Sequence, residues 1–106
     1  METSNVKLVV FVPISHADIV RRALGEAGAG KIGNYDFCSF SSRGVGRFLG
    51  NEKSNPTIGD AGKYEEVEEE RIEVIVPREI LEKVISAMKK VHPYEEVAYD
   101  IYSIEN

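Results

Sequence analysis

The chain has 106 residues, a formal net charge of −5, and 42% hydrophobic and 29% charged residues. This length is typical of one domain with its own core, so we expect residues 1–106 to form a single domain. The acidic balance argues against binding to nucleic acid or to anionic membranes, which basic surfaces favour. The chain has one cysteine, Cys38, and an N-terminal apolar run too short to span a membrane. We therefore expect a soluble cytoplasmic protein without disulfides.

The first half of the chain predicts a strand, a helix and a second strand. Residues 7–12 form an almost uninterrupted apolar run, which is typical of a central strand buried on both faces. A near capping box at Ser15 begins a helix, and Gly28 is a favourable helix stop. Residues 35–42 alternate in the manner of a second strand, on which Cys38 would lie.

The second half predicts a strand, a helix and a final strand. Residues 43–63 contain five glycines and are expected to form an extended loop or hairpin. A third strand is predicted over residues 64–76, a second helix begins at Pro77, and residues 95–102 form the last strand.

The resulting βαββαβ order predicts an α+β fold, the ferredoxin-like split sandwich. In this fold a four-stranded antiparallel sheet carries both helices on one face. The other face of the sheet would be left exposed to solvent, and self-association through its aromatic residues would bury it. The candidates are Tyr35, Phe37 and Tyr99.

Two acidic or glycine-rich segments are candidate ligand sites. In the 43–63 segment, glycines let backbone N–H groups approach a ligand, and Arg43, Arg47 and Lys63 could hold a phosphate or carboxylate. The alternative is a mobile hairpin whose glycines serve its turns. The glutamates between residues 65 and 70 could bind a hard cation, or they could form a solvated strand surface that discourages edge pairing.

The run over residues 92–102 places an imidazole, phenols and carboxylates at a helix–strand junction. Because Pro93 disfavours helical geometry in the preceding residue, His92 should lie at the end of the second helix, where the helix dipole favours a cation. His92 could instead bind a metal or act as a general base with its polar neighbours Tyr94, Glu95 and Glu96. The other histidine, His16, could share an ion with it only if the two junctions meet.

Several ordered motifs resemble one family. They are residues 30–40, 44–48, 56–59, 66–69, 71–73 and 92–102, and together they extend the match over about residues 6–105. They resemble the PII/CutA-like insert domain of YqfO-type proteins, the NGG-interacting-factor-three-like family, which is sometimes labelled GTP cyclohydrolase type-two-like. The His92-Pro93-Tyr94-Glu95 element also resembles the CutA family.

The resemblance implies a PII/CutA-like domain that forms homotrimers and binds small molecules near subunit clefts. Segment 43–63 would take the place of the PII effector loop, and the position of His92 is linked with metal binding in CutA proteins. Full-length YqfO members flank this domain with the halves of a dinuclear metal hydrolase-like domain, which this sequence lacks, so no catalytic residues are assigned. The CutA cysteine on the first strand is also unmatched, because Val10, Phe11 and Val12 stand there.

We therefore predict a non-enzymatic, oligomeric regulatory or ligand-binding module, in which ordering of segment 43–63 is the signal. The alternative is a CutA-like protein that binds a divalent metal ion through His92 and Glu95. An enzyme is a third hypothesis, for which no acid–base pair is evident. The expected partners are further copies of the chain and a hydrolase-like or other regulatory protein. The expected ligand-binding residues are Gly44, Gly46, Arg47, Phe48, Gly59, Gly62, His92, Tyr94, Glu95 and Glu96.

Overall fold

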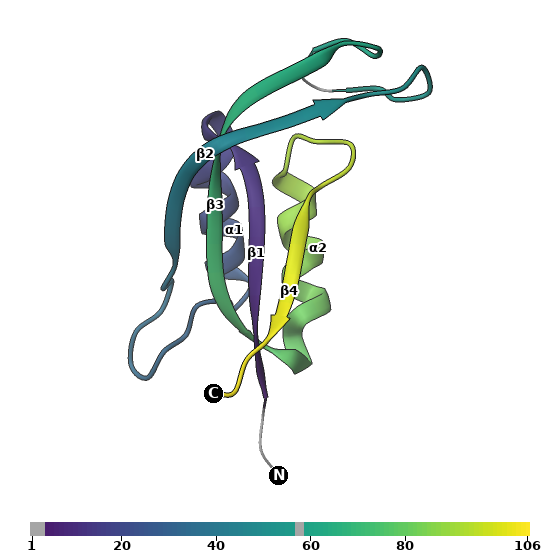
Figure 1. Cartoon of the computed structure of the whole chain (residues 1–106). Helices are drawn as coiled ribbons and strands as arrows, with labels where there is room; N and C mark the ends of the chain where they lie inside the picture. Colours follow the sequence, from purple (N-terminus) through teal and green to yellow (C-terminus); the bar gives the residue numbers. More distant parts are fainter. Residues whose placement is uncertain (1–3, 57–58) are drawn as a thin grey trace.

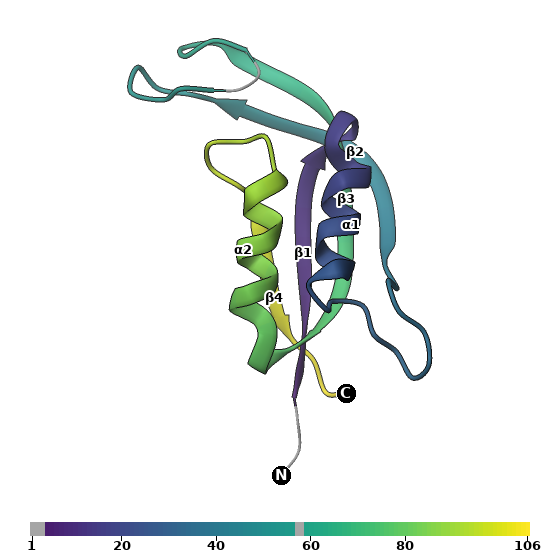
Figure 2. The ribbon, with the colours of Figure 1, turned by 180° about the vertical axis from the view of Figure 1, so that it is seen from behind.

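The computed structural model describes residues 4–56 and 59–106 (Figure 1). Its strands form one antiparallel sheet in the order β2-β3-β1-β4. Both helices cover the same face of this sheet (Figure 2). The predicted ferredoxin-like split sandwich is therefore confirmed. The elements in chain order are β1 (Asn5–Pro13), the 3-10 turn η1 (Ile14–His16), α1 (Ala17–Glu26), β2 (Phe40–Leu49), β3 (Tyr64–Pro77), the 3-10 turn η2 (Arg78–Ile80), α2 (Leu81–Val91) and β4 (Tyr99–Ser103).

Strand β1 lies at the centre of the molecule, between β3 and β4. Its alternate residues Val6, Leu8, Val10 and Val12 are fully buried and join the core beneath the helices. Val9, which alternation places on the opposite face, is also fully buried. The prediction of a central strand buried on both faces is therefore confirmed for this part of β1. The helices contribute buried apolar side chains to the same core, including Val20, Leu24, Val84 and Met88.

Strands β2 and β3 continue past the end of β1 as a curved two-stranded arm (Figure 1). Glu69 is the first β3 residue that pairs with β1, whereas the β2–β3 pairing extends outward to Leu49 opposite Tyr64. We call residues 45–56 and 59–68 the arm. The predicted extended loop or hairpin over residues 43–63 takes the hairpin form in the described residues. Residues 43–49 belong to β2, because β3 satisfies the backbone hydrogen bonds of this glycine-containing stretch.

Residues 27–39 form a loop instead of the beginning of the second strand. The N–H of Gly30 donates to the carbonyl of Ile75, and the N–H of Cys38 donates to the carbonyl of Gly30, both at 2.8 Å. These bonds hold the backbone between α1 and β3, so β2 begins only at Phe40. The prediction of a strand over residues 35–42, with Cys38 on it, is therefore wrong for residues 35–39.

Aromatic residues other than those predicted lie on the open face of the sheet. Tyr35 and Phe37 lie in the 27–39 loop, where they are 74% and 56% exposed. Tyr99 packs against the core beneath the helices. By alternation from Val9, the open face instead carries Phe11, Phe40 and Tyr102.

The ends of two predicted elements also differ from the structure. Ser15 makes no capping bond, since its hydroxyl lies 2.8 Å from His16 Nδ1 and a 3-10 turn precedes α1. Strand β4 begins at Tyr99 instead of residue 95, because residues 92–98 connect it to α2 and its register with β1 starts only at Tyr99. Within the described residues, no helix is long and apolar enough to cross a membrane.

Candidate functional site

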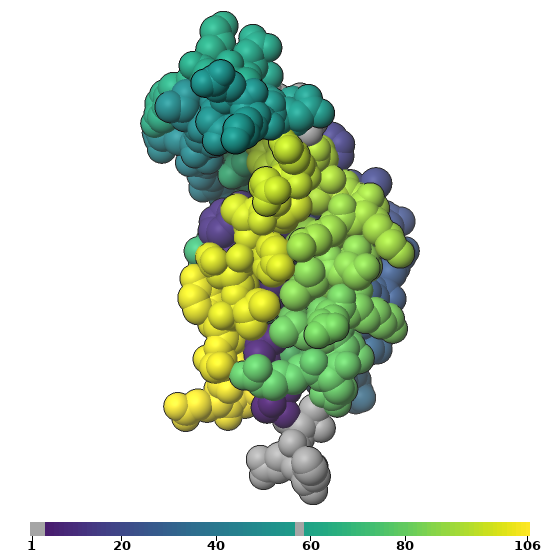
Figure 3. All heavy atoms as spheres, turned by 90° about the vertical axis from the view of Figure 1, so that its right-hand side faces the viewer, coloured from purple at the N-terminus to yellow at the C-terminus, as the bar shows by residue number. Residues whose placement is uncertain are grey.

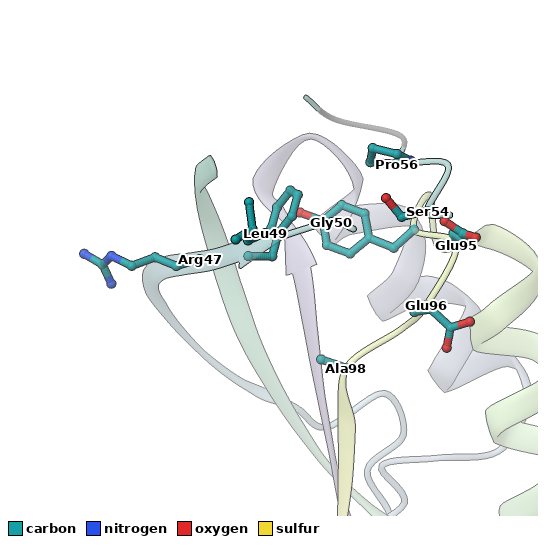
Figure 4. A pocket seen from close by; sticks show the side chains of 10 residues that line it. Arg47, Leu49, Gly50, Ser54, Pro56, Glu95, Glu96 and Ala98 are labelled. Atoms are coloured by element: carbon teal, nitrogen blue, oxygen red, sulfur yellow. The ribbon is translucent and has the colours of Figure 1, made fainter. Parts of the chain in front are cut away.

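The arm lies over the segment that connects α2 to β4 (Figure 3). Between them is a cavity of about 300 Å³, which we call the arm cavity. Its lining comes from two stretches of chain that are distant in sequence (Figure 4). The arm contributes Arg47, Phe48, Leu49, Gly50, Ser54 and Pro56, and the connecting segment contributes Tyr94, Glu95, Glu96 and Ala98.

Two contacts join the walls of the arm cavity. The rings of Phe48 and Tyr94 meet edge to face, with centroids 6.2 Å apart and planes at 61°. At the mouth, the N–H of Asn55 donates to Glu95 Oε1 at 2.8 Å. Aromatic pairs and charge-assisted hydrogen bonds of these kinds stabilise the position of the arm against the body.

Arg47 extends away from the arm cavity (Figure 4). Its Nε donates to Glu66 Oε2 at 3.1 Å across the β2–β3 pair. Arg47 lines the arm cavity, but its charge is directed toward Glu66, and its role in ligand binding stays a prediction.

Tyr94 is held by a buried carboxylate behind the arm cavity. Its hydroxyl donates to Glu69 Oε2 at 2.8 Å. Burial and this hydrogen bond raise the pKa of Tyr94 above its usual 10.0, so the phenol stays protonated and remains a donor. A Cβ atom at Gly46 would lie 2.2 Å from Glu69 Oε1. Gly46 therefore serves the site by leaving room for the carboxylate that orients Tyr94.

The backbone of Phe11 holds both ends of the connecting segment. Its carbonyl lies 2.8 Å from Nε2 of His92, and its N–H donates to the carbonyl of Ala98 at 3.2 Å. The N–H of Tyr94 donates to Nδ1 of His92 at 3.2 Å. Since a carbonyl can only accept, this pattern requires the neutral tautomer with its proton on Nε2.

The environment of His92 favours the neutral ring. Burial lowers the pKa of His92, and the charge of nearby His16 acts in the same direction. The carbonyl of Phe11 and the charge of Glu69 oppose this shift without reversing it. His92 lies at the C-cap of α2, as predicted, but its lowered pKa disfavours the cation that an interaction with the helix dipole needs.

The structure distributes the ten predicted ligand residues over several places. The arm cavity unites five of them: Arg47, Phe48, Tyr94, Glu95 and Glu96. Gly44 and Gly46, with Arg47, line a second cavity of about 440 Å³ beside Arg43 and Arg71. His92 contacts Tyr94 from behind, at 5.2 Å between ring centroids. Gly59 and Gly62 lie in the tip with positive φ angles of 79° and 84° and line neither cavity.

Half of the residues that line the arm cavity were not predicted from the sequence. The missed residues are Leu49, Gly50, Ser54, Pro56 and Ala98. The apolar character of Leu49 and Pro56 within a polar segment is the one signal that could have indicated them.

The described residues contain no group of three or more His, Cys, Asp or Glu side chains arranged to hold a metal ion. Both ring nitrogens of His92 are engaged, and Glu95 accepts the bond from Asn55. Metal binding by His92 and Glu95 stays a prediction. It would require the hydrogen bonds of His92 and Glu95 to be replaced by bonds to the metal ion. The two histidine junctions lie at the same end of β1, since His92 contacts the carbonyl of Phe11 and His16 follows Pro13 in η1.

The glutamates of β3 do not all form a solvated surface. Glu69 and Glu70 are buried, and they are paired with Tyr94 and Arg21, respectively. The interpretation as a solvated surface is therefore wrong for these two residues, since buried carboxylates need such partners.

No family model matches the sequence. A GTP cyclohydrolase 1 type 2 homolog from Halalkalibacterium halodurans is 57% identical over 100 residues, and its Bacillus subtilis counterpart is 52% identical over 99 residues. A solved Bacillus cereus protein related to NIF3 is 51% identical and superimposes on all of this chain with a TM-score of 0.87. The chain is a homologue of one domain-sized segment of these NIF3-related, YqfO-type proteins.

The aligned segments cover 94% and 93% of this YqfO-type domain, but only 27% and 26% of the two sequence relatives. The domain thus spans about a quarter of the length of the curated relatives it matches. Their shared name states a homology and does not establish an enzymatic activity for the domain.

Solved CutA proteins share the fold of the YqfO-type domain. The periplasmic divalent cation tolerance protein CutA from Archaeoglobus fulgidus has a TM-score of 0.69 and 18% identity, over 96% of this chain and 85% of that protein. The PII-like protein CutA from Nostoc sp. PCC 7120 has a TM-score of 0.67 and 15% identity, over 95% of this chain and 82% of that protein. At this level of identity, the similarity shows the PII/CutA-like fold alone.

Proposed function

We propose that the YqfO-type domain is a non-enzymatic, oligomeric regulatory module that binds a small molecule in the arm cavity. The observation that carries this proposal is the cavity itself. Its volume of about 300 Å³ is at the lower end of the range typical of small-molecule sites. Its walls combine apolar side chains with a few polar groups, which is the usual composition of such sites.

The position of the arm would transmit the signal. Beyond β1, the arm is a two-stranded extension, and such hairpins are marginally stable without further packing. A ligand between Phe48 and Tyr94 would add contacts that hold the arm against the body. Because β2 already extends to Leu49, the conformational change would be docking of the arm and not ordering of the whole 43–63 segment.

Exposed apolar side chains support an oligomeric state. On β2 and β3, Phe40, Leu49 and Tyr64 are 67%, 63% and 64% exposed. On β4, Ile101 and Tyr102 are 43% and 44% exposed. Assembly into a homotrimer would bury these groups and would place the arm cavity at a subunit cleft. The greater length of the relatives makes a hydrolase-like or other regulatory protein a suitable further partner.

Divalent-metal binding through His92 and Glu95 is the second candidate function. The observation that favours it is the shared fold with a protein described as a divalent cation tolerance protein. The metal would replace the bonds of His92 to Phe11 and Tyr94, or it would use ligands from a second copy of the chain.

Native mass spectrometry of the protein purified without chelator tests both proposals. We expect a homotrimer that retains a small organic mass, and we expect Tyr94→Ala to release it while Tyr35→Ala, an exposed loop control, retains it. Stoichiometric zinc or copper that is lost in His92→Gln would favour the metal-binding alternative. Monomers at all concentrations, or trimers that neither retain nor acquire a ligand, would contradict the ligand-binding proposal.

A further inference from the structure

We infer that the arm cavity selects an organic cation, namely a protonated amine attached to an apolar or aromatic group. This inference rests on the proposed function, because it names the chemistry of the ligand for the same cavity. It differs from the anionic ligand that the glycine- and arginine-containing sequence of the arm indicates.

The walls of the arm cavity suit the apolar part of such a ligand. Phe48, Leu49, Pro56, Tyr94 and Ala98 present carbon surface from both sides. Phe48 and Tyr94 are fixed by their mutual contact, and Tyr94 is also held by Glu69. Fixed aromatic rings attract cations through their faces, as in the sites that recognise ammonium groups.

The charges around the arm cavity favour a cation. Glu95 and Glu96 both belong to the lining and are exposed residues. The Glu95 carboxylate lies beside Ser54, whereas the Glu96 side chain extends away from Leu49 and Gly50 (Figure 4). Arg47 is the one cationic side chain in the described lining, and it points away toward its partner Glu66 (Figure 4). An anionic ligand would lie beside the Glu95 carboxylate, with that of Glu96 farther off and no facing cation, whereas an ammonium group would be attracted to this negative charge.

A bare divalent metal ion is a poorer match for the same place. Such ions require several oxygen or nitrogen ligands around one point, and most of the arm cavity wall is carbon. The cations of the molecule lie elsewhere: Arg43, Arg47 and Arg71 line the second cavity together with Glu69. Arg47 and Arg71 are paired there with Glu66 and Glu73.

The test is an NMR titration of backbone amides with three probes of similar shape: protonated phenethylamine, neutral 2-phenylethanol and anionic 3-phenylpropionate. We expect shifts at Gly50, Ser54 and Ala98, with the amine bound at least about fivefold more tightly than the alcohol and the acid bound most weakly. The double variant Glu95→Gln/Glu96→Gln should reduce the preference for the amine to within about twofold, since glutamine keeps the acceptor for Asn55 without the charge.

A matched control removes the same charge elsewhere. Glu79→Gln/Glu82→Gln alters two exposed glutamates on η2 and α2, outside the arm cavity lining, and should leave the preference intact. If the alcohol or the acid binds as well as the amine, the inference is overturned while a ligand-binding cavity remains. If no probe shifts these amides, the inference fails as well, and the native mass spectra decide whether the proposed function fails with it.

Discussion

Glu69 is the residue through which the arm and the body are most closely connected. Its carboxylate is buried, lies against the backbone of Gly46 and accepts the hydroxyl of Tyr94. A buried carboxylate is costly unless it is hydrogen-bonded, so Tyr94 and the space above Gly46 are both needed. The glycine that sequence analysis assigned to a ligand thus supports the site from outside the arm cavity.

Replacing Gly46 with alanine should destabilise the domain by about 1–2 kcal/mol, because the new methyl group displaces the Glu69 carboxylate and breaks its bond to Tyr94. The matched control is Gly44→Ala, since a Cβ atom there meets nothing within 4 Å. Gly44→Ala should be neutral or slightly stabilising. Urea unfolding of both variants measures the difference, and equal stabilities would contradict this role of Gly46.

The second residue-scale prediction concerns pH. The pKa of His92 is lowered in the folded state from the reference value of 6.5, mainly by burial. The unfolded chain therefore binds a proton more readily than the native state does. His92 thus contributes stability that is present above the unfolded pKa and is lost as pH falls toward the folded one.

We expect the free energy of unfolding, measured in the presence of a chelator, to decrease as pH falls from about 7.5 to 5. His92→Gln should flatten this dependence, because glutamine can donate to the carbonyl of Phe11 without titrating in this range. His16→Gln is the control and should retain most of the slope, since His16 makes only one of the contributions to the shift. A slope that is unchanged in His92→Gln would show that other groups cause it.

Among the elements, the loop over residues 27–39 best illustrates how a few backbone bonds determine where a strand begins. Gly30 has a φ angle of 82° and lies between the carbonyl of Ile75 and the N–H of Cys38. Gly33 also has a positive φ angle, 57°, but a Cβ atom there would meet nothing within 4 Å.

Gly30→Ala should be destabilising by at least about 1 kcal/mol more than Gly33→Ala. Both substitutions strain a left-handed backbone, but only the new Cβ at residue 30 would lie 2.4 Å from a backbone oxygen, that of Cys38. Hydrogen exchange should show the loss of protection at Cys38 in Gly30→Ala, where the loop detaches from β3. Equal effects of the two substitutions would mean that steric contact with Cys38 does not hold the loop.

The whole molecule is elongated, with principal extents of 49 × 22 × 22 Å. The arm bends across one end of the sheet (Figure 1). Its apolar residues Val45, Leu49 and Tyr64 are exposed in the single chain. Exposed apolar groups on strands favour association, whereas single ones on helices are common in monomers.

If the proposed homotrimer forms, we expect Phe40→Ser to shift sedimentation from the trimer toward the monomer at micromolar concentration. Ile19→Ser is the control: Ile19 is 49% exposed on α1, which covers the opposite face of the sheet (Figure 2), and its substitution should leave the assembly unchanged. If Phe40→Ser sediments as the parent protein does, the open sheet face and the arm are not the assembly surface.

The sequence by itself determined the order of the elements and the composition of the core. The apolar, β-branched run over residues 7–12 indicates a buried strand, and the helical spacing of apolar residues in α2 indicates an amphipathic helix, so local patterns were sufficient. The family resemblance was also carried by local motifs. Both kinds of information depend on residues close together in the chain.

Only the tertiary structure decided where β2 lies and what the polar residues do. Strand β2 contains glycines and lacks a strong pattern, and it forms because the long β3 pairs with it through Leu49. The bond from Asn55 to Glu95 joins residues 40 positions apart, and the contact of His92 with Phe11 joins residues 81 apart. Contacts over such separations depend on how the whole chain packs, which explains why the arm cavity, the outward direction of Arg47 and the neutral state of His92 could not be predicted from local sequence.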